Sequence, residues 1–207
     1  MPLKDWYDRY VLPYALDFAC GLPVIAAQRR TVIPQAAGRV LEVGIGTGLN
    51  FAFYDRAKVT QLVGLDPAVQ MHRLARRRSE RAGLPLELHS IAAECIPFEA
   101  SSFDCVVCTY TLCSVADPAA ALAEMRRVLR PTGVLLFAEH GLAPDPAVVR
   151  WQRRIEPYWG QIAGGCHLTR EVPHLLRDAG FHLRMDCGYV AWPKMLSYNF
   201  WGTATRT

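Results

Sequence analysis

The stretch Val40-Leu41-Glu42-Val43-Gly44-Ile45-Gly46-Thr47-Gly48-Leu49-Asn50 decides the fold of this chain. An apolar run ends in an acid, and glycines then stand at every second position. This pattern predicts a buried parallel strand that leads into a tight turn, where glycine permits positive φ and lets a ligand approach the main chain. The G-x-G-x-G spacing differs from the G-x-G-x-x-G of dinucleotide sites. Because Glu42 would repel a pyrophosphate, the turn favours a ligand with a positive charge.

A second acid extends the argument. The segment Leu62–Asp66 predicts the next buried strand, and Asp66 follows the glycine turn by roughly 20 residues. Doubly wound nucleotide-binding folds place there a carboxylate that accepts both ribose hydroxyls. S-adenosylmethionine is a nucleoside ligand that carries the positive charge favoured by Glu42, on its amino group and on its sulfonium. The alternative is a glycine-rich turn with an incidental acid, and the combination of strand, turn, helix and second strand disfavours it.

From these residues onward the chain resembles the class I S-adenosylmethionine-dependent methyltransferases, over about Gly38 to Gly180. A closer likeness is to the alkyl-thiol methyltransferases of the methyltransferase-like group. The general likeness continues through Ala92–Phe98, Ser102–Thr109 and Arg127–Leu135, and the closer one is marked by Val107–Thr109, Leu112–Val115, Glu139-His140 and Cys166–Glu171.

This resemblance implies S-adenosylmethionine as cofactor, S-adenosylhomocysteine as its product, and no metal. Many relatives carry an aspartate before the Ala-Glu pair, where this chain has Ala92, so adenine recognition is expected from the Ala93 backbone or the Glu94 side chain. The residues expected to bind the cofactor are Glu42, Gly44, Gly46, Gly48, Asp66, Pro67, Met71, Ala93, Glu94, Thr109 and Leu112.

The order of elements predicts an α/β fold with a Rossmann-like, doubly wound, mostly parallel seven-stranded sheet and an antiparallel C-terminal edge. Asp117 is expected to cap one helix, Thr169 another, and Gly180 to end the latter. The expected strands are Arg39–Val43, Gln61–Leu65, Leu86–Ile91, Phe103–Tyr110, Val134–His140, Phe181–Trp192 and Ser197–Thr205. The expected helices are Asp5–Cys20, Pro23–Val32, Leu49–Ala57, Ala68–Ala82, Pro118–Leu129, Ala147–Glu156 and Arg170–Asp178.

We expect one methyltransferase domain over residues 1–207, with an N-terminal helical lid (1–37), a cofactor-binding core (38–140) and a substrate-side insert (141–168). Tyr7, Tyr10 and Tyr14 fall at i, i+3 and i+7, on one helical face. Core packing explains such a stripe, and closure of a lid over the cofactor is the functional alternative.

Composition excludes several classes. The chain has 207 residues, of which 51% are hydrophobic and 20% charged, and it carries a net charge of +4. It lacks the roughly 18 uninterrupted apolar residues of a membrane helix, and its first residues lack the basic-then-apolar order of a signal peptide. A cytoplasmic location is therefore expected. The membrane anchor found in the thiol-methyltransferase relatives is not expected here. The basic run Arg73–Arg81 is interpreted as a solvated helix face rather than a nucleic-acid site. The number of subunits stays open.

Seven cysteines raise the question of a metal or redox site. Cys105 and Cys108 form a Cys-x-x-Cys, but they lie in an expected strand, where an offset of three points the side chains to opposite faces. We expect free thiols in a reducing compartment, with Cys113 and Cys166 near the substrate entrance.

The predicted function is methyl transfer to a small apolar acceptor, with a thiol favoured. A quinone carbon and a lipid amine remain alternatives, as does a non-catalytic S-adenosylmethionine-binding protein. A nicotinamide oxidoreductase is disfavoured, since its glycine motif and hydride-transfer residues are absent. His140 is the candidate base, with His167 next, although either can be a structural histidine. The other expected substrate-side residues are Tyr7, Tyr10, Cys113 and Trp159.

Overall fold

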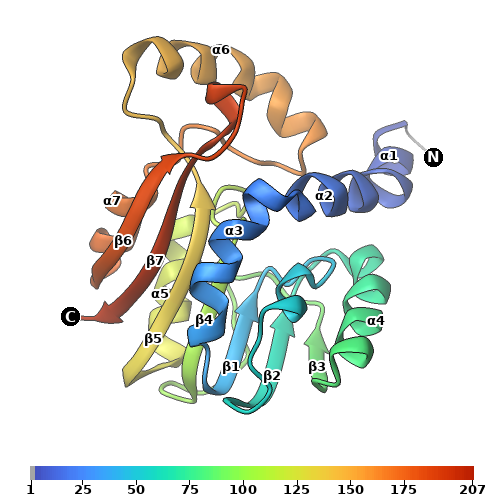
Figure 1. Ribbon diagram of the computed structural model, residues 1–207, viewed down its shortest axis with the longest axis vertical. Coiled ribbons are helices and arrows are strands. Elements are labelled where there is room, and N and C mark those ends of the chain that lie inside the picture. The colour runs from blue at the N-terminus through green and yellow to red at the C-terminus, as the bar shows by residue number, and fades with distance from the viewer. Residues whose placement is uncertain (1–2) are drawn as a thin grey trace.

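The computed structural model describes residues 3–207, in which one seven-stranded sheet is flanked by helices (Figure 1). The strand order is β3-β2-β1-β4-β5-β7-β6. The five strands from β3 to β5 are mutually parallel, while β7 runs antiparallel to β5 and to β6. The predicted fold class is thus confirmed. The strand bounds are β1 Gly38–Val43, β2 Val59–Leu65, β3 Leu86–His89, β4 Phe103–Thr109, β5 Leu129–His140, β6 Phe181–Tyr189 and β7 Tyr198–Arg206.

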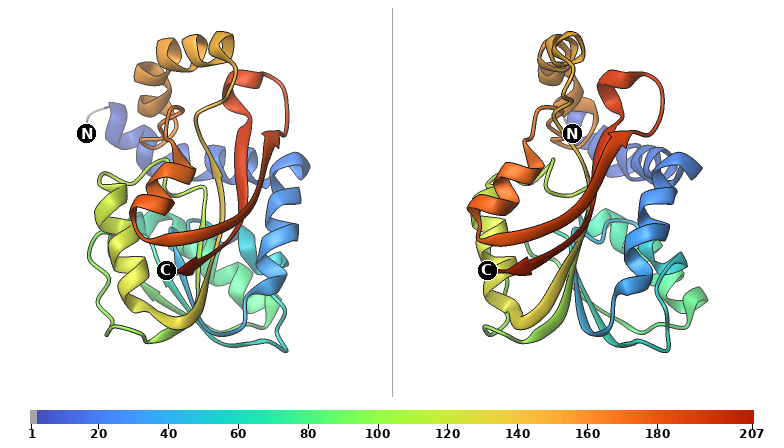
Figure 2. Two further views of the ribbon diagram at one scale, coloured as in Figure 1. Left: turned by 90° about the vertical axis from the view of Figure 1, so that its left-hand side faces the viewer. Right: turned by 60° about the vertical axis from the view of Figure 1, so that its left-hand side comes forward.

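Helices cover both faces of the sheet. The side chains of the apolar central strands alternate between these two faces, so both faces are buried. Leu41 packs in a cluster with residues of α5 (Pro118–Val128) and α7 (Val172–Asp178). Val40 packs on the other face in a cluster that includes the end of α3 (Pro23–Val32). Figure 2 shows α5 and α7 on one side of the sheet and α3 on the other. Cys105 and Cys108 belong to opposite clusters, which confirms that their sulfurs face apart.

The helical segment formed by residues 3–21 lies at the end of the sheet where the parallel strands terminate (Figure 1). The single helix expected over Asp5–Cys20 is divided at Val11 into α1 (Leu3–Tyr10) and α2 (Leu12–Gly21). The division is explained by Pro13 in the first turn of α2, because proline lacks the N–H that a continuous helix needs and its ring clashes with the preceding turn. The predicted tyrosine stripe is therefore shared between two helices, with Tyr14 on α2.

The helix expected over Leu49–Ala57 is wrong, since only a single 3-10 turn, η2 (Leu49–Ala52), is present. The side chains of Asn50 and Tyr54 both donate hydrogen bonds to the buried Glu42 carboxylate. These bonds, together with a turn closed by the side chain of Asp55, hold the segment in an irregular path. The hydrogen bonds to buried Glu42 therefore outweigh the helical periodicity of residues 49–57.

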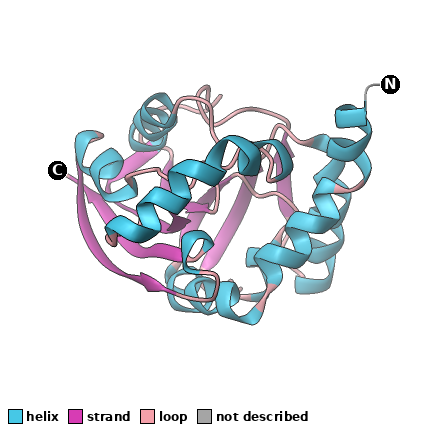
Figure 3. Ribbon diagram, turned by 90° about the horizontal axis from the view of Figure 1, so that it is seen from above, coloured by secondary structure: helices cyan, strands magenta, loops and turns pink. Residues whose placement is uncertain are grey.

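Two predictions fail around α6 (Pro146–Ile162), which lies above the sheet in Figure 1 and is also seen from above in Figure 3. The helix continues through Pro157, beyond the expected end at Glu156. Thr169 does not cap the following helix, because α7 begins after Glu171 and makes no side-chain cap bond there. The hydroxyl of Thr169 instead donates to the Glu156 carboxylate at 2.7 Å. This bond ties the loop after α6 back onto that helix.

The remaining helix is α4 (His72–Ala82), and the other 3-10 turns are η1 Ile33–Gln35, η3 Val69–Met71 and η4 Lys194–Leu196. Asp117 caps α5 as expected, accepting from the backbone N–H groups of Ala119 and Ala120. Within residues 3–207, no helix combines the length and apolarity needed to cross a membrane.

Candidate functional site

A cavity of about 430 Å³ lies where the central strands end and α2 faces them. Of the residues expected to bind the cofactor, all but Gly48 and Leu112 line it. Leu112 is instead fully buried in the core. The lining that sequence reasoning identified is Glu42, Gly44, Gly46, Asp66, Pro67, Met71, Ala93, Glu94 and Thr109.

The glycine turn has the backbone conformation that its spacing predicts. Gly44, Gly46 and Gly48 have φ values of 71°, 53° and 82°, which disfavour any residue with a Cβ. A Cβ on Gly44 would collide with the Thr111 side chain. A Cβ on Gly46 would come no closer than 3.7 Å to any of its neighbours, which are Met71 Sδ, Asp66 Oδ2 and the Gly44 carbonyl oxygen, so it would extend into the cavity. The turn thus leaves room for a ligand against the Gly46 backbone.

Asp66, which follows β2, is fixed against this turn. Its Oδ2 accepts the N–H of Gly46 and its Oδ1 accepts the N–H of Ala68, both at 2.8 Å. Burial raises the pKa of this carboxyl above its usual value, and the two backbone bonds oppose that rise. Each carboxylate oxygen keeps one further lone pair, because a carboxylate accepts about four hydrogen bonds. The pair of oxygens fits the two hydroxyls of a ribose.

Glu42, the second acid, is almost fully buried at the end of β1. Its Oε1 accepts from Asn50 Nδ2 at 2.9 Å and its Oε2 from the Tyr54 hydroxyl at 2.7 Å. Burial raises the pKa of the Glu42 carboxyl to about 7. A cationic group entering the cavity would favour the ionised form, so this acid matches an ammonium better than a phosphate.

Arg29 on α3 is a cavity residue that sequence reasoning missed. It is only 3% exposed, its Nη1 donates to the carbonyl oxygen of Cys20 at 2.6 Å, and its guanidinium lies 4.6 Å from the Tyr110 ring centroid. Its Nε is buried without a hydrogen-bond partner. The cavity therefore holds a buried cation as well as the acid Glu42, and this pair suits a zwitterionic amino-acid group.

A polar link joins α2 to the glycine turn. Asp17 on α2 accepts from the Thr47 hydroxyl at 2.5 Å and forms an ion pair with Arg78 of α4 at 2.6 Å. Arg78 also donates to the Thr47 carbonyl oxygen at 2.8 Å. Arg78 belongs to the basic run that was interpreted as a solvated helix face, so that interpretation does not hold for this arginine. The link fixes α2 over the cavity.

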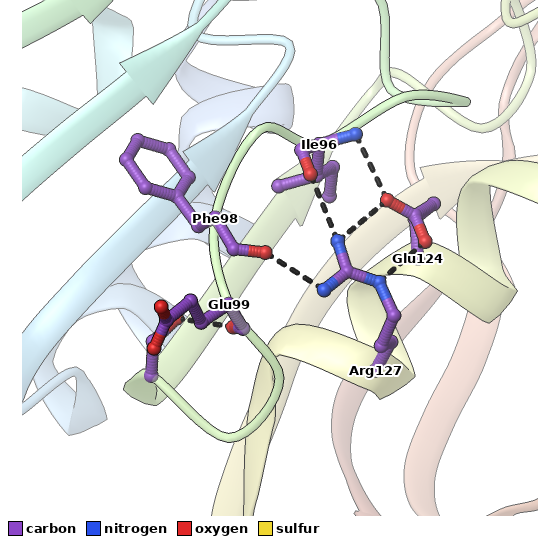
Figure 4. Close-up of polar contacts among 6 residues, drawn as sticks. Ile96, Phe98, Glu99, Glu124 and Arg127 are labelled. Carbon is purple, nitrogen blue, oxygen red and sulfur yellow. Dashed lines mark hydrogen bonds and ion pairs between the residues drawn. The ribbon is translucent and has the colours of Figure 1, made fainter.

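The loop that carries residues 92–94 is held by α5. Figure 4 shows the Arg127 guanidinium donating to the carbonyl oxygens of Ile96 at 2.8 Å and Phe98 at 2.7 Å. Glu124 pairs with the same guanidinium and accepts the Ile96 N–H at 3.0 Å. Because a guanidinium offers five donors in a rigid fork, one side chain fixes two points of the loop. The wall expected to meet adenine is thus positioned before a ligand arrives.

Glu94 lines the cavity, and its Oε1 accepts the Asp117 N–H at 3.1 Å. Ala93 is buried beside it. Both groups named for adenine recognition therefore border the cavity.

The expected catalytic and substrate-side residues lie elsewhere. His140, the last residue of β5, does not line the cavity, and its Nδ1 lies 3.6 Å from Cys166 Sγ. Cys113 completes this group, in which the three ligand atoms all lie within 4.8 Å of one another. The base role of His140 stays a prediction, but the structure gives its ring two sulfur neighbours.

Four other residues expected on the substrate side also lie outside the cavity lining. Tyr7 donates to the carbonyl oxygen of Ile162 at 2.9 Å, which joins α1 to α6, and Tyr10 is exposed. His167 contacts the Glu156 carboxylate at 3.5 Å. The indole N–H of Trp159 is buried without a partner.

The chain is similar in sequence to known methyltransferases. The family model of the methyltransferase domain matches residues 41–137. Rat thiol S-methyltransferase TMT1B is 41% identical over 145 residues, which cover 69% of this chain and 59% of that protein, so the chain spans under two thirds of its length. Human thiol S-methyltransferase TMT1A is 36% identical over 191 residues, covering 86% of this chain and 76% of that one.

A solved structure from Thermotoga maritima, described as an S-adenosylmethionine-dependent methyltransferase and possible histamine N-methyltransferase, superposes with a TM-score of 0.68. It is 20% identical, and the match covers 99% of this chain and 100% of that one. At this identity the likeness establishes the fold alone.

Proposed function

This chain belongs to the S-adenosylmethionine-dependent methyltransferase family, and we propose that it transfers the methyl group of that cofactor to a small apolar thiol. The observation that carries the proposal is one cavity at the carboxyl ends of the strands that holds two buried acids and a buried arginine. Strand ends at the point where the strand order reverses are the usual ligand site of such sheets.

The cavity lining fits each part of the cofactor. The Asp66 carboxylate would hold the ribose hydroxyls, and the backbone at Gly46 would lie against the ligand. Glu42 would face the ammonium and Arg29 the carboxylate of the amino-acid part. Adenine would lie against Ala93, with the Glu94 side chain beside it.

When bound, S-adenosylmethionine supplies a methyl group on a sulfonium, which is already an activated leaving group and needs no metal for its departure. The protein then has to align the acceptor and exclude water. Leu12 and Leu16 of α2 supply apolar surface to the cavity. The link from Asp17 to Arg78 would keep α2 in place, so residues 1–37 act as the lid in this proposal.

A thiol acceptor is supported by the names of the two relatives, both thiol S-methyltransferases, and by the ease with which a thiol is deprotonated. A thiol with a pKa of about 8.5 is partly ionised near neutral pH, so a strong base is unnecessary.

The test is product formation with S-adenosylmethionine and a panel of alkyl thiols, a quinone and a lipid amine, followed by mass spectrometry of the methylated acceptor. We expect thioether products from several thiols, since an apolar pocket discriminates one methylene by only about 1–3 kcal/mol. Turnover of the quinone or amine alone would overturn the acceptor assignment. S-adenosylhomocysteine binding without any turnover would indicate a non-catalytic binding protein.

A further inference from the structure

Three potential metal ligands from distant parts of the chain meet beside the cofactor cavity. Cys113 lies in the loop after β4, His140 ends β5, and Cys166 lies in the loop after α6. Their ligand atoms all lie within 4.8 Å of one another, and Cys113 and His140 are buried while Cys166 is half-buried. Within residues 3–207 no other histidine, cysteine or carboxylate group has this arrangement.

The backbone brings the two sulfurs together by a defined route. The turn after α6 contains Gly164 and Gly165, with φ values of 63° and 82°, which lets the chain reverse and direct Cys166 inward. The N–H of His167 then donates to the carbonyl oxygen of Cys113 at 2.8 Å. Because a backbone hydrogen bond joins the two cysteine segments, the sulfurs are held close without a covalent bond.

The spacing suits a tetrahedral ion. Zinc binds sulfur at about 2.3 Å and imidazole nitrogen at about 2.0–2.1 Å, so neighbouring ligand atoms around it lie roughly 3.4–3.8 Å apart. The distance of 3.6 Å between Cys166 Sγ and His140 Nδ1 falls in that range. Two thiolates and one imidazole form a soft donor set that selects zinc over magnesium or calcium.

The geometry points to a zinc site formed by Cys113, His140 and Cys166, which departs from the sequence expectation of no metal. On binding, the two thiols release their protons to solvent as their sulfurs bond to the ion, and the neutral His140 ring donates its Nδ1 lone pair. Three protein ligands leave one tetrahedral position open, as in catalytic rather than structural zinc sites.

The open position gives the site a role in the proposed function, and this step rests on that function. Ser114 and Gly164 line the cofactor cavity, and they lie within two residues of Cys113 and Cys166 respectively. An acceptor thiol that binds the ion would release its proton to solvent and be held as a thiolate next to that cavity. Its sulfur would then form a bond to the methyl carbon as the bond from that carbon to the sulfonium sulfur breaks, which leaves S-adenosylhomocysteine. His140 is then a metal ligand and not the base that removes the acceptor proton.

The first experiment measures zinc directly, without reference to activity. The untagged full chain is purified under reducing conditions, exposed to zinc, dialysed and analysed for metal, and its affinity is measured by competition with a chromophoric chelator. We expect one zinc per chain, and an affinity at least about 100-fold lower in Cys113→Ser, Cys166→Ser and His140→Ala. Cys187→Ser, which changes an exposed cysteine on β6, is the matched control and should bind zinc normally.

S-adenosylhomocysteine binding and circular dichroism establish that each variant is folded. Less than stoichiometric zinc in the reduced wild type would overturn the site, as would equal zinc affinity in the variants. A Cys113–Cys166 disulfide that forms in place of metal binding would also overturn it.

The second experiment tests the role of the open position. Cobalt is substituted for zinc, and the absorption bands of the thiolate-bound ion are recorded during titration with an alkyl thiol. A shift that saturates is expected, and an unchanged spectrum would reject thiol coordination. If thiol methylation continues at full rate after zinc removal, the acceptor role fails while the methyltransferase assignment stands. If zinc and thiol bind but no thioether forms, the proposed function fails and the metal site stands.

Discussion

Glu42→Gln tests whether the buried acid of β1 meets the cationic end of the cofactor. Glu42 is 1% exposed, and burial raises the pKa of its carboxyl from 4.5 to about 7. The folded state therefore binds this proton more tightly than the unfolded chain does. Its contribution to stability is complete below pH 4.5 and is lost as the pH rises through 7. A shift of this size corresponds to about 3 kcal/mol.

Glutamine removes the titration while keeping the local bonds. Its Oε1 can accept from Asn50, and its Nε2 can donate to the Tyr54 hydroxyl oxygen, since a hydroxyl acts in either role. The ligand-free variant should therefore lose up to about 3 kcal/mol less stability than the wild type between pH 4.5 and 8. Urea unfolding at several pH values measures this difference.

In the wild type, cofactor affinity should rise with pH over the range in which stability falls. Above pH 7 the wild-type carboxylate is ionised and attracts the ammonium group, a charged interaction of about 1.5–3 kcal/mol that glutamine lacks. Calorimetric titration with S-adenosylhomocysteine should show affinity rising from pH 6 to 8 in the wild type and staying flat in Glu42→Gln. If the variant keeps the wild-type affinity and pH profile, Glu42 does not meet the cationic group.

Glu139→Gln is the matched control for this experiment. Glu139 is fully buried, burial raises the pKa of its carboxyl to about 7, and it lies outside the cavity lining. It accepts the N–H groups of Thr111 and Leu112, and a glutamine oxygen can still accept both. The control should reproduce the change in pH-dependent stability and keep the pH dependence of cofactor binding.

Three further predictions follow from the site and the core. Asp66→Asn should weaken S-adenosylhomocysteine binding by about 1.5–3 kcal/mol through loss of a charged acceptor, and calorimetry showing unchanged affinity would contradict the ribose assignment. Asp17→Asn should speed proteolytic cleavage of α1 and α2 while lowering global stability by only about 0.5–1 kcal/mol, because the ion pair to Arg78 is partly exposed; Lys4→Gln, which breaks an exposed pair within α1, is its control and should leave the cleavage rate unchanged. Leu122→Ala, at a fully buried position of α5, should cost about 2–5 kcal/mol in urea unfolding, and a smaller loss would mean that the core refills the cavity.

The sheet could be predicted because each central strand carries a short apolar run, and the runs in β1, β2 and β5 end at the acids Glu42, Asp66 and Glu139. The bounds of α3 agree with the sequence prediction over Pro23–Val32, since proline opens the helix. The irregular path of residues 49–57 could not be predicted, because it depends on hydrogen bonds to Glu42, which precedes this segment and does not enter its local helical periodicity. The prediction that Thr169 caps α7 was wrong for a similar reason, since the Thr169 hydroxyl donates to a carboxylate on another helix.

The site divides in the same way. The glycines and acids at strand ends can be recognised by their spacing, and Glu42, Gly44, Gly46 and Asp66 line the cavity as expected, whereas Gly48 does not. Arg29 resembles an ordinary surface arginine in the sequence, and only the tertiary fold shows that it is buried. Cys113, His140 and Cys166 come from separate segments, so no spacing rule predicts that they meet.

The position of β7 has a consequence for how the molecule is made. This strand, Tyr198–Arg206, follows every other strand along the chain, yet it lies between β5 and β6. Until it leaves the ribosome, one side of β5 has no partner and presents unpaired N–H and C=O groups, which are a template for association with other chains. Nascent protein should therefore depend on chaperones until β7 has been synthesised, and premature termination before Tyr198 should yield aggregates rather than a smaller folded enzyme.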